Sequence, residues 1–341
     1  MARLAGVSPS TASLAFSGAG PVAEATRIRV LAAAQELHYA GPDPRGRSLR
    51  RGRSGIVGVI TQQRLGDAFR DPIKIALLDG LAEEVADMDA GLLLLTPDGG
   101  APNRIEEAPM DAVVLMGYDD RIATALTALR HRGVPAVAIE GIPSDGIVTI
   151  GQDNREATRT AARYLFDQGH RRVAVVALPF ASDRARGFYD TEPARPVGTT
   201  TAIDRLAGAR DVFPDALVWW TRGSQVEEGR LAARALLAST TDRPTAIIAQ
   251  SDLLAAGVIR AAEDAGLAVP QDLSVVGFDG VRVDGLWPYD LTTLVQPATE
   301  KGRAAGRALL TLLHGDVAES VTFSSVFRQG NTAGQYGSGG T

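Results

Sequence analysis

The chain has 341 residues, of which 45% are hydrophobic and 22% charged, the composition of a globular protein with two or three compact units. It contains no cysteine, which excludes disulfide frameworks, thiol nucleophiles and thiolate metal sites. The formal net charge of −5 argues against a nucleic-acid partner for the chain taken as a whole. Because the sequence has neither a signal-peptide pattern nor a run of roughly 20 apolar residues, we expect a cytoplasmic protein without a membrane partner.

The charge is distributed unevenly along the chain. Residues 1–54 contain eight arginines against three acidic residues, a net charge of +5, so the remainder carries −10. A basic head on an acidic body is expected when one end of a protein approaches phosphates. A charged terminus that is merely solvated is the alternative on charge alone.

The first 40 residues predict three short helices. A one-turn helix precedes Gly6, and Ser8 is expected to cap a second helix from Pro9 to about Phe16, which ends at the breaker Ser17–Pro21. A third helix is expected from Glu24 to Leu37, with its core-facing residues at helical spacing: Ile28, Leu31 and Leu37. This pattern indicates a helix-turn-helix domain over residues 1–40.

Residues 41–54 are rich in proline, glycine and arginine and contain one large apolar side chain, Leu49, so they are interpreted as a hinge. From residue 55 short apolar runs alternate with amphipathic stretches, which predicts parallel sheets covered by helices on both faces. The expected strands are 55–60, 91–95, 111–116, 136–139, 172–178, 216–220, 245–250 and 273–278, and a helix is expected over about 73–88.

The length of this second part is enough for two lobes with a crossover near residues 150–154. We expect an α/β core over 55–328, with lobe 1 made of 55–150 and 279–295 and lobe 2 of 151–278 and 296–328. The stretch 178–204 is expected to be a long loop, and 329–341 a disordered tail.

Polar residues stand at three expected strand ends, where ligands bind in such domains. They are Asp252, Asp279 and Gln296, whose oxygens suit the hydroxyls of a sugar or nucleoside. Helix capping is the alternative role for Asp252, because it opens a helix. Phe69 and Lys74, near the first helix of the core, are candidates for the opposite wall of the site.

Several segments in succession resemble the lactose-repressor (LacI/GalR) family of bacterial regulators over nearly the whole chain. They are ARLAGVSPSTAS, RIRVLAAAQELHY, RSLRRGRSGIVGVI, QDNREATRTAARYLFDQGHRRVAVV, RPTAIIAQSDLLAAGVIRAAEDAGLAVPQDLSVVGFDG and LTTLVQPATEKGRAAGRALL. The resemblance implies a helix-turn-helix head, a core like that of periplasmic binding proteins, and a homodimer on a near-palindromic operator in double-stranded DNA.

By matching position, the resemblance implies that Pro9, Ser10 and Leu14 face base edges. It implies phosphate contacts for Ser8, Thr11 and Ser13, for which capping and solvation are the alternative. In the hinge it implies that Leu49 enters the minor groove as a wedge, with Arg47, Arg50 and Arg51 nearby. Packing of Leu49 on the core is the alternative.

The chain departs from the family pattern at five places. Leu14 stands where many members carry a base-reading arginine, Ala12 replaces a larger apolar residue, and Ala23 and His38 replace a capping serine and glycine. The resemblance also places Met1 inside the first helix. These departures predict either a start upstream of Met1 or a weakened or specialised DNA-binding head.

The resemblance further implies a ligand-binding arginine. Arg205, followed by Leu-Ala-Gly, is the better match, and Arg184 is a competing candidate. Trp219 and Trp220 are candidates for a stacking face, although alternation along a strand places at least one of them in the core.

Three other classes of protein were compared with this interpretation. A nucleotide-binding α/β enzyme would need a G-x-G-x-x-G or Walker loop, which is absent, and the four histidines are expected at the surface or at helix ends without metal-ligand spacing. A periplasmic solute-binding protein would need an export signal. A family member that senses a small molecule without binding DNA stays open. We therefore predict a non-enzymatic, sequence-specific transcriptional regulator, a repressor, controlled by a small-molecule effector without cofactor or metal.

Overall fold

The structure is a computed structural model. It describes residues 1–18, 20–39, 52–61, 64–96, 104–117, 123–141, 146–180, 185–189, 200–239 and 242–337. The chain divides into two units, Met1–Ser54 and Gly55–Thr341. The candidates Arg47, Leu49, Arg50, Arg51 and Arg184 lie outside the described residues. None of the described helices has the length and apolar character that a membrane span needs.

Among the described residues of the head, a single turn in which Ala5 N donates to Met1 O precedes helices α1 (Pro9–Ser17) and α2 (Glu24–Glu36). Ser8 caps α1 as predicted, because its hydroxyl accepts a hydrogen bond from the Thr11 amide at 3.1 Å and Pro9 follows at the first helical position. Gly18 ends α1 in the left-handed conformation, which glycine adopts at little cost.

The core of the head is made mostly of alanine. Its buried residues are Ala5, Ala12, Ala15, Val30 and Ala33. The prediction that Ile28, Leu31 and Leu37 face this core is wrong, since all three are exposed, Ile28 by 59%. Small side chains therefore form the buried centre of the head, and the larger Met1, Phe16 and Val22 pack against it while remaining partly exposed.

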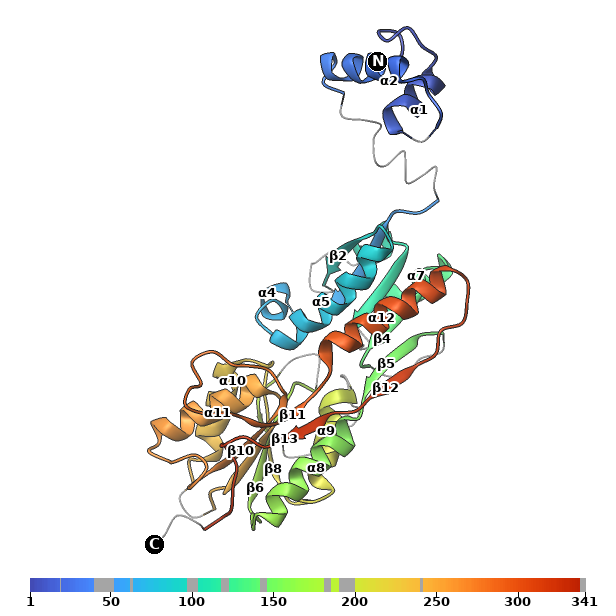
Figure 1. The fold of residues 1–341 in the computed structure, drawn as a ribbon. Helices are drawn as coiled ribbons and strands as arrows, with labels where there is room; N and C mark the ends of the chain where they lie inside the picture. The colour runs from blue at the N-terminus through green and yellow to red at the C-terminus, as the bar shows by residue number, and fades with distance from the viewer. Residues whose placement is uncertain are drawn as a thin grey trace. The chain divides into compact units, whose positions relative to one another are not determined.

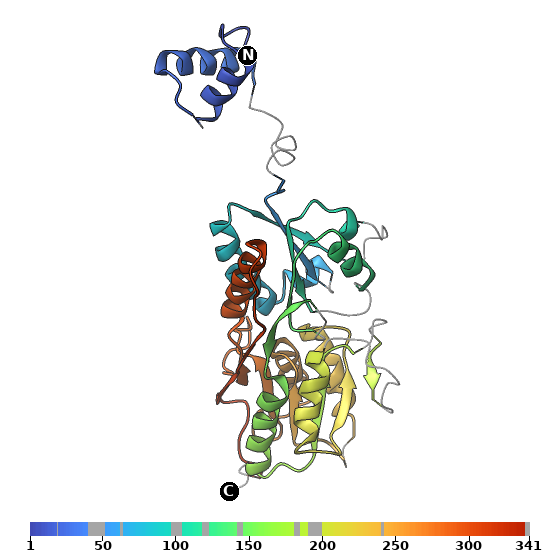
Figure 2. The same ribbon diagram turned by 90° about the vertical axis from the view of Figure 1, so that its right-hand side faces the viewer.

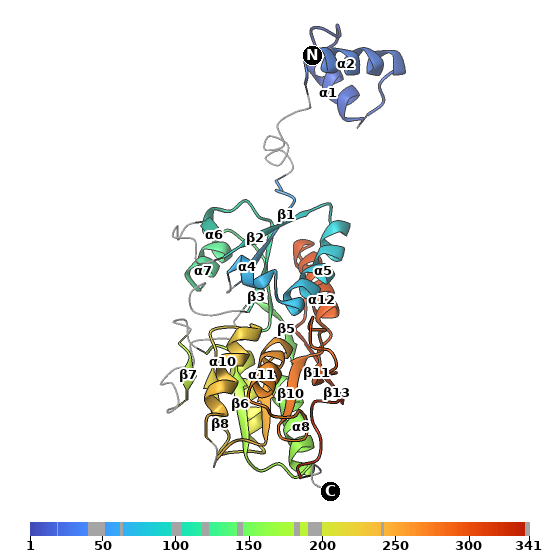
Figure 3. The same ribbon diagram turned by 90° about the vertical axis from the view of Figure 1, so that its left-hand side faces the viewer.

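Lobe 1 is built on a six-stranded parallel sheet in the order β12-β5-β4-β3-β1-β2. Its strands are β1 (Ile56–Thr61), β2 (Gly91–Leu95), β3 (Ala112–Met116), β4 (Ala136–Ile139), β5 (Val148–Gln152) and β12 (Val321–Phe323). Its helices are α4 (Leu65–Ala68), α5 (Pro72–Asp87), α6 (Arg104–Glu107), α7 (Ala123–His131) and α12 (Ala298–Leu313). One face of the sheet packs on α5 and α12 and the other on α6 and α7 (Figure 3).

Lobe 2 is built on a seven-stranded sheet in the order β13-β11-β10-β9-β6-β8-β7, parallel except at its two edges. Its strands are β6 (Val173–Ala177), β7 (Gly187–Phe188), β8 (Leu217–Trp220), β9 (Ala246–Ala249), β10 (Ser274–Asp279), β11 (Thr292–Val295) and β13 (Val326–Arg328). Its helices are α8 (Asn154–Asp167), α9 (Thr200–Arg210), α10 (Val226–Leu236) and α11 (Asp252–Asp264). The pair α8 and α9 covers one face and α10 and α11 the other (Figure 1), which confirms the predicted two-lobed α/β core.

The predicted assignment of the C-terminal segments to the lobes is wrong. Strand β11 pairs with β10 in lobe 2, whereas α12 and β12 belong to lobe 1. The chain therefore crosses between the lobes three times, after β5, β11 and β12. The assignment follows from packing: α12 lies beside α5 (Figure 2), and a Cβ on Gly302 would lie 2.2 Å from Leu77 O, so the backbones touch through glycine.

The expectation of a disordered tail is wrong for residues 329–337. Thr332 is fully buried, its backbone oxygen accepts from Val275 N at 2.7 Å, and its hydroxyl donates to Val275 O at 2.8 Å. Farther along, Tyr336 N donates to Gln168 O at 2.9 Å. This segment extends the hydrogen bonding of lobe 2 beyond its last strand.

The C-terminal segment also buries His170. His170 was expected at the surface or at a helix end, but it is buried, with Nδ1 2.9 Å from Thr245 Oγ1 and Nε2 3.0 Å from Gly334 O. Burial lowers the pKa of His170. The tail covers a histidine that the helix ending at Asp167 alone would leave exposed.

Candidate functional site

A group of hydrogen-bonded polar side chains joins lobe 1 to lobe 2, and we call it the interlobe cluster. Its members stand just after strands or near the starts of helices: Glu140, Asn154, Thr201, Arg205, Asp279, Gln296 and Lys301. Strand carboxyl ends are where ligands bind in open α/β domains, because loops and helix starts converge there. The cluster is therefore the candidate small-molecule site.

Arg205, on α9, is the central cation of this cluster and is 3% exposed. Its Nε donates to Asn154 Oδ1 at 2.8 Å, one terminal nitrogen donates to Gln250 O at 2.5 Å, and the guanidinium lies 3.4 Å from the centre of the Phe278 ring. The same terminal nitrogen is 3.7 Å from Asp279 Oδ1. Arginine suits this position because its planar guanidinium group can donate hydrogen bonds to several fixed partners at once.

Asp279 is the last residue of β10 and Gln296 follows the neighbouring strand β11, and the structure brings the two side chains together as expected. Gln296 Nε2 donates to Asp279 Oδ1 at 2.7 Å, and both residues are buried. Burial raises the pKa of Asp279 well above its usual range, against the opposing charge of Arg205. Asp279 also has a positive φ of 123°, a conformation found where surrounding structure enforces it, often at functional sites.

Glu140 and Lys301 were not predicted from the sequence, yet they carry the ion pair of the cluster. Lys301 is fully buried on α12; its ammonium donates to Glu140 Oε1 and, at 3.0 Å, to Gln296 Oε1. Glu140 Oε2 accepts from Asn154 Nδ2 at 3.0 Å and from Thr201 Oγ1 at 2.7 Å, both in lobe 2. Glu140 is therefore a bridge between the lobes.

The ionisation of this pair is governed by burial and by neighbouring charge. Burial alone would raise the pKa of Glu140, but the charges of Lys301 and Arg205 outweigh it and hold that pKa well below its usual range. Burial lowers the pKa of Lys301, and the negative charge of Glu140 opposes this. Glu140 also has a positive φ of 52°. We conclude that an anionic carboxylate is held in a constrained backbone at the junction of the lobes.

Asp252 lies near this cluster but is occupied within lobe 2. Its Oδ1 accepts from Thr293 Oγ1 at 2.6 Å and its Oδ2 from Val281 N at 2.8 Å, while Ser251 caps α11 through Leu254 N. Asp252 thus holds the segment after β10 against β11, and the predicted alternative, that Asp252 caps a helix, is wrong because Ser251 is the cap. Burial raises its pKa to about 7.

The other wall contains Lys74 and Phe69. Lys74 is half-buried on α5, and its charge contributes to the lowered pKa of Lys301, so it lies within electrostatic reach of the cluster. Phe69 ends α4 and more than half of its surface is exposed. The nearby Asp71, which caps α5 through Ile73 N, is buried and has a pKa raised by burial.

The two tryptophans of β8 pack on opposite faces of the sheet, as alternation along a strand requires. Trp219 contacts the apolar core under α10 and α11, and Trp220 the one under α8 and α9. Trp220 also forms an edge-to-face contact with Tyr189, with ring centres 4.9 Å apart. Both are half-buried parts of the core rather than one exposed stacking surface.

Two sequence signals could have identified the unpredicted residues. Glu140 directly follows the apolar run AVAI, so the rule that selected Asp279 and Gln296 also selects it. Lys301 lies on the face of α12 that contains Ala298, Ala305 and Leu309, where a lone lysine indicates a buried charge with a partner. The partner itself could not be predicted, because it comes from a strand 161 residues earlier in the chain.

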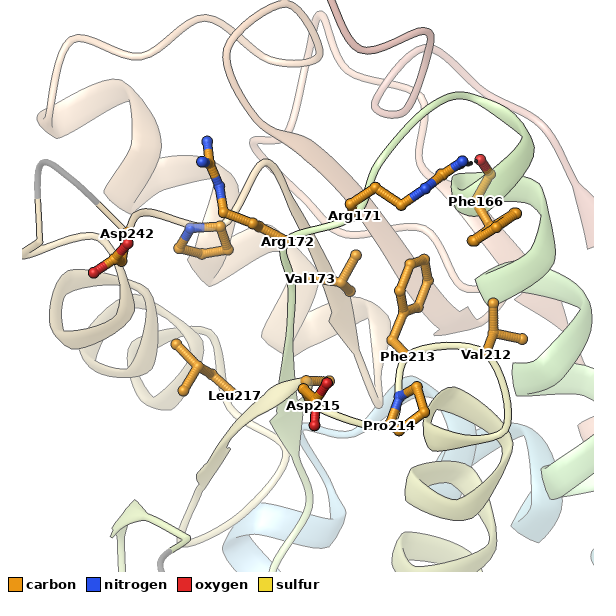
Figure 4. Close-up of a pocket in the computed structure, with 12 residues that line it drawn as sticks. Phe166, Arg171, Arg172, Val173, Val212, Phe213, Pro214, Asp215, Leu217 and Asp242 are labelled. Carbon is orange, nitrogen blue, oxygen red and sulfur yellow. Dashed lines mark hydrogen bonds between the residues drawn. The ribbon is translucent and has the colours of Figure 1, made fainter.

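A hollow of about 320 Å³ lies beside the starts of β6 and β8 in lobe 2 (Figure 4). It is lined by Phe166, by Arg171 at the start of β6, and by the loop before β8 that contains Phe213 and Asp215. The Arg171 guanidinium lies 3.7 Å from the centre of the Phe166 ring and donates to Phe166 O at 2.8 Å. Because this hollow lies at the amino ends of the strands, it lacks the convergence of loops that is found at the interlobe cluster.

The head presents one face of α1 to solvent. Ser10, Ser13, Leu14 and Ser17 are exposed, whereas Ala12 and Ala15 are buried against α2. The predicted DNA-contacting residues of the head, Ser8, Pro9, Ser10, Thr11, Ser13 and Leu14, all lie in α1 or at its cap, and all but Thr11 are exposed. A helical head joined through an arginine-rich segment to a two-lobed α/β core is the arrangement of a DNA-binding regulator.

Comparison with known proteins gives the family. Residues 1–41 match the family described as bacterial regulatory proteins, lacI family, and residues 162–328 match the periplasmic binding protein-like domain. The HTH-type transcriptional regulator IpsA of Corynebacterium glutamicum is 30% identical over 96% of this chain and 94% of its own.

Two solved structures share the fold. The lac repressor dimer bound to operator and the anti-inducer ONPF has a TM-score of 0.75 and 21% identity, covering 97% of each chain. The complex of the transcriptional regulator CelR with cellobiose has a TM-score of 0.69 and 24% identity, covering 97% of this chain and 98% of CelR. The chain belongs to the lacI family and is a DNA-binding transcriptional regulator.

Proposed function

We propose that this regulator is a cytoplasmic repressor that binds a sugar or a related hydroxylated metabolite at the interlobe cluster and thereby changes its affinity for a near-palindromic operator. One observation carries the proposal. Side chains of both lobes, Glu140 and Lys301 from lobe 1 and Arg205 and Asp279 from lobe 2, meet in one hydrogen-bonded group at the strand ends. A ligand that takes over these bonds must change how the lobes are held together.

The chemistry of the cluster favours an uncharged, hydroxylated effector. Its cations Arg205 and Lys301 lie against the carboxyl groups of Asp279 and Glu140, and the nearby Lys74 lies close to the carboxyl group of Asp71. An ionic ligand would leave a buried charge without a counter-ion, which is costly. A hydroxyl group both donates and accepts, so it can replace a hydrogen bond of the cluster without adding charge. The cellobiose complex of CelR supports this class of ligand.

We propose a homodimer, because each recognition helix then meets one half of the operator. The lac repressor structure, a dimer on operator, supports this arrangement. Trp287, 92% exposed in the segment between β10 and β11, is a candidate contact, since tryptophan is enriched at protein interfaces. Sedimentation should give a dimer, and Trp287→Ser should weaken it; a wild-type monomer at micromolar concentration would contradict the homodimer.

The test of the proposal has two arms. First, duplexes selected from a random library are measured by fluorescence anisotropy across a salt series; specific binding with a steep negative salt slope is expected. Second, a panel of mono- and disaccharides and nucleosides is added to the complex, and at least one should change the operator affinity. Enrichment of no sequence would favour the alternative of a sensor that does not bind DNA. A DNA response to none of the panel would refute the effector class.

A further inference from the structure

The outward face of α1 has an unusual composition for a surface that reads DNA. The helix, PSTASLAFS, contains no charged residue, no asparagine and no glutamine. Its exposed side chains beyond the first turn are Ser13, Leu14 and Ser17, and Ser10 lies on the same side. Arginine, lysine, asparagine and glutamine are the side chains that read guanine or adenine through two hydrogen bonds. Helix α1 cannot make a contact of that kind.

The remaining ways of reading a base are limited. A serine hydroxyl both donates and accepts, so it bonds to several base edges and discriminates weakly. An apolar side chain discriminates by contact with the C5-methyl group of thymine, which projects into the major groove. Of the four outward side chains after Pro9, Leu14 is the one large apolar group.

Leu14 is placed to make such a contact. It is 42% exposed, although leucine is normally buried. Its position is also partly fixed: a Cβ on Gly20 would lie 3.1 Å from Leu14 Cδ2, so the absence of a side chain at Gly20 leaves the space that Leu14 occupies. A side chain already supported on one side loses less conformational freedom when it packs against DNA.

The positive charge of the head lies outside this face. Arg3, Arg27 and Arg29 are exposed, and a Cβ on Gly18 would lie 3.3 Å from an Arg27 terminal nitrogen, so Arg27 lies over the end of α1. Contacts from such residues to phosphates supply affinity without reading sequence. Affinity and base reading are thus assigned to different residues.

We propose that Leu14 reads the C5-methyl group of a thymine in each half-site, so that the base preference at this pair is set by one apolar contact. The inference rests on the proposed function, because it requires that α1 enters the major groove. It predicts an A·T pair at the symmetric position next to Leu14, and sensitivity to a methyl group at that position.

The test uses the wild-type protein and a duplex selected from a random library. Each thymine is replaced in turn by deoxyuridine, which removes only the methyl group. Burial of one methyl predicts about a fourfold loss of affinity when one half-site is changed and about fifteenfold when both are. At the same pair, 5-methylcytosine should bind more tightly than cytosine, because it restores the methyl group.

A substitution of Leu14 tests whether this residue causes the discrimination between thymine and deoxyuridine. Leu14→Ala should bind the thymine and deoxyuridine duplexes almost equally. Leu4→Ala is the matched control, because Leu4 is an exposed leucine of the same head but lies outside α1; it should keep the full discrimination. Circular dichroism at equal concentration verifies that the helices of both variants form.

The outcomes separate the inference from the function on which it rests. Tight, specific binding that no deoxyuridine substitution weakens would overturn the role of Leu14 and leave the regulator intact. Discrimination that persists in Leu14→Ala would also overturn it. If no sequence is enriched from the library, DNA reading itself fails, and the inference fails with it.

Discussion

The outward face of α1 and the interlobe cluster have opposite chemistry. The face of α1 is exposed, uncharged and built from three serines and Leu14. The cluster is buried and charged, and each of its ionised groups has a hydrogen-bonded partner. The two regions should therefore respond differently to substitution. In the interlobe cluster a substitution leaves a buried polar group without its partner and destabilises the core. On α1 a substitution changes one contact to a base and has little effect on stability.

The largest expected effect is that of removing the buried cation. Lys301→Met leaves the largely buried Glu140 without its ion-pair partner, so the core should lose about 3 kcal/mol of unfolding free energy. Urea unfolding of the core measures this. The double variant Lys301→Met with Glu140→Gln, which removes both charges, should recover most of the loss. A single variant with the wild-type midpoint would show that the pair is not buried as described.

A smaller effect is expected in the tail. The Thr332 hydroxyl accepts from Thr292 N at 2.9 Å and donates to Val275 O at 2.8 Å. Thr332→Val keeps the shape but leaves two buried backbone groups unpaired, which should cost about 2 kcal/mol. Thr332→Ser keeps the hydroxyl and should cost less. Equal unfolding free energies for the valine variant and the wild type would contradict the ordered tail.

On the head the expected effect is smaller still. Ser8→Ala removes the cap of α1 and should destabilise the head by about 1 kcal/mol, whereas Ser8→Thr should retain most of the stability. The helical signal during thermal unfolding of the head measures both variants, and operator affinity should fall in the same order. Identical melting of the alanine variant and the wild type would refute the cap.

The smallest effect depends on pH. Because burial lowers the pKa of His170 in the folded state, the unfolded chain binds more protons as the pH falls below about 6.5. The contribution of neutral His170 to stability is therefore complete above this pH and is lost as the pH falls through the lowered pKa. Wild type minus His170→Gln, compared by urea unfolding from pH 5 to 8, should show this slope. A difference that does not depend on pH would contradict it.

Much of the core could be predicted because its strands are continuous apolar runs between helices, and the observed bounds of β1, β2, β3 and β4 lie within one residue of the expected ones. The points at which the chain crosses between the lobes could not be predicted, because the sequence patterns of LTTLV and α12 are compatible with either lobe. Their places depend on pairing with β10 and on close packing of Gly302 with α5. Helical periodicity also gave the wrong buried face for α2, because Ile28 is exposed and the core of the head is built mostly from alanines.

Three of the seven residues of the interlobe cluster were predicted from the sequence. Polar residues after strands identified Asp279 and Gln296, and the family resemblance identified Arg205. Lys301 could not be assigned to the site from its position in the first turn of α12, because its role depends on a strand end far away in the sequence. Asp252 satisfied the same rule, and its carboxyl group accepts hydrogen bonds from Val281 N and Thr293 Oγ1 within its own lobe.

The central claim is that the interlobe cluster controls the head, and linkage tests it most directly. For the panel compound with the largest effect, the factor by which it changes operator affinity must equal the factor by which operator changes its own affinity. Arg205→Lys, which keeps the charge but loses the fork, should bind operator with wild-type affinity and no longer respond to that compound. An unchanged response in Arg205→Lys, or unequal factors in the wild type, would contradict the account.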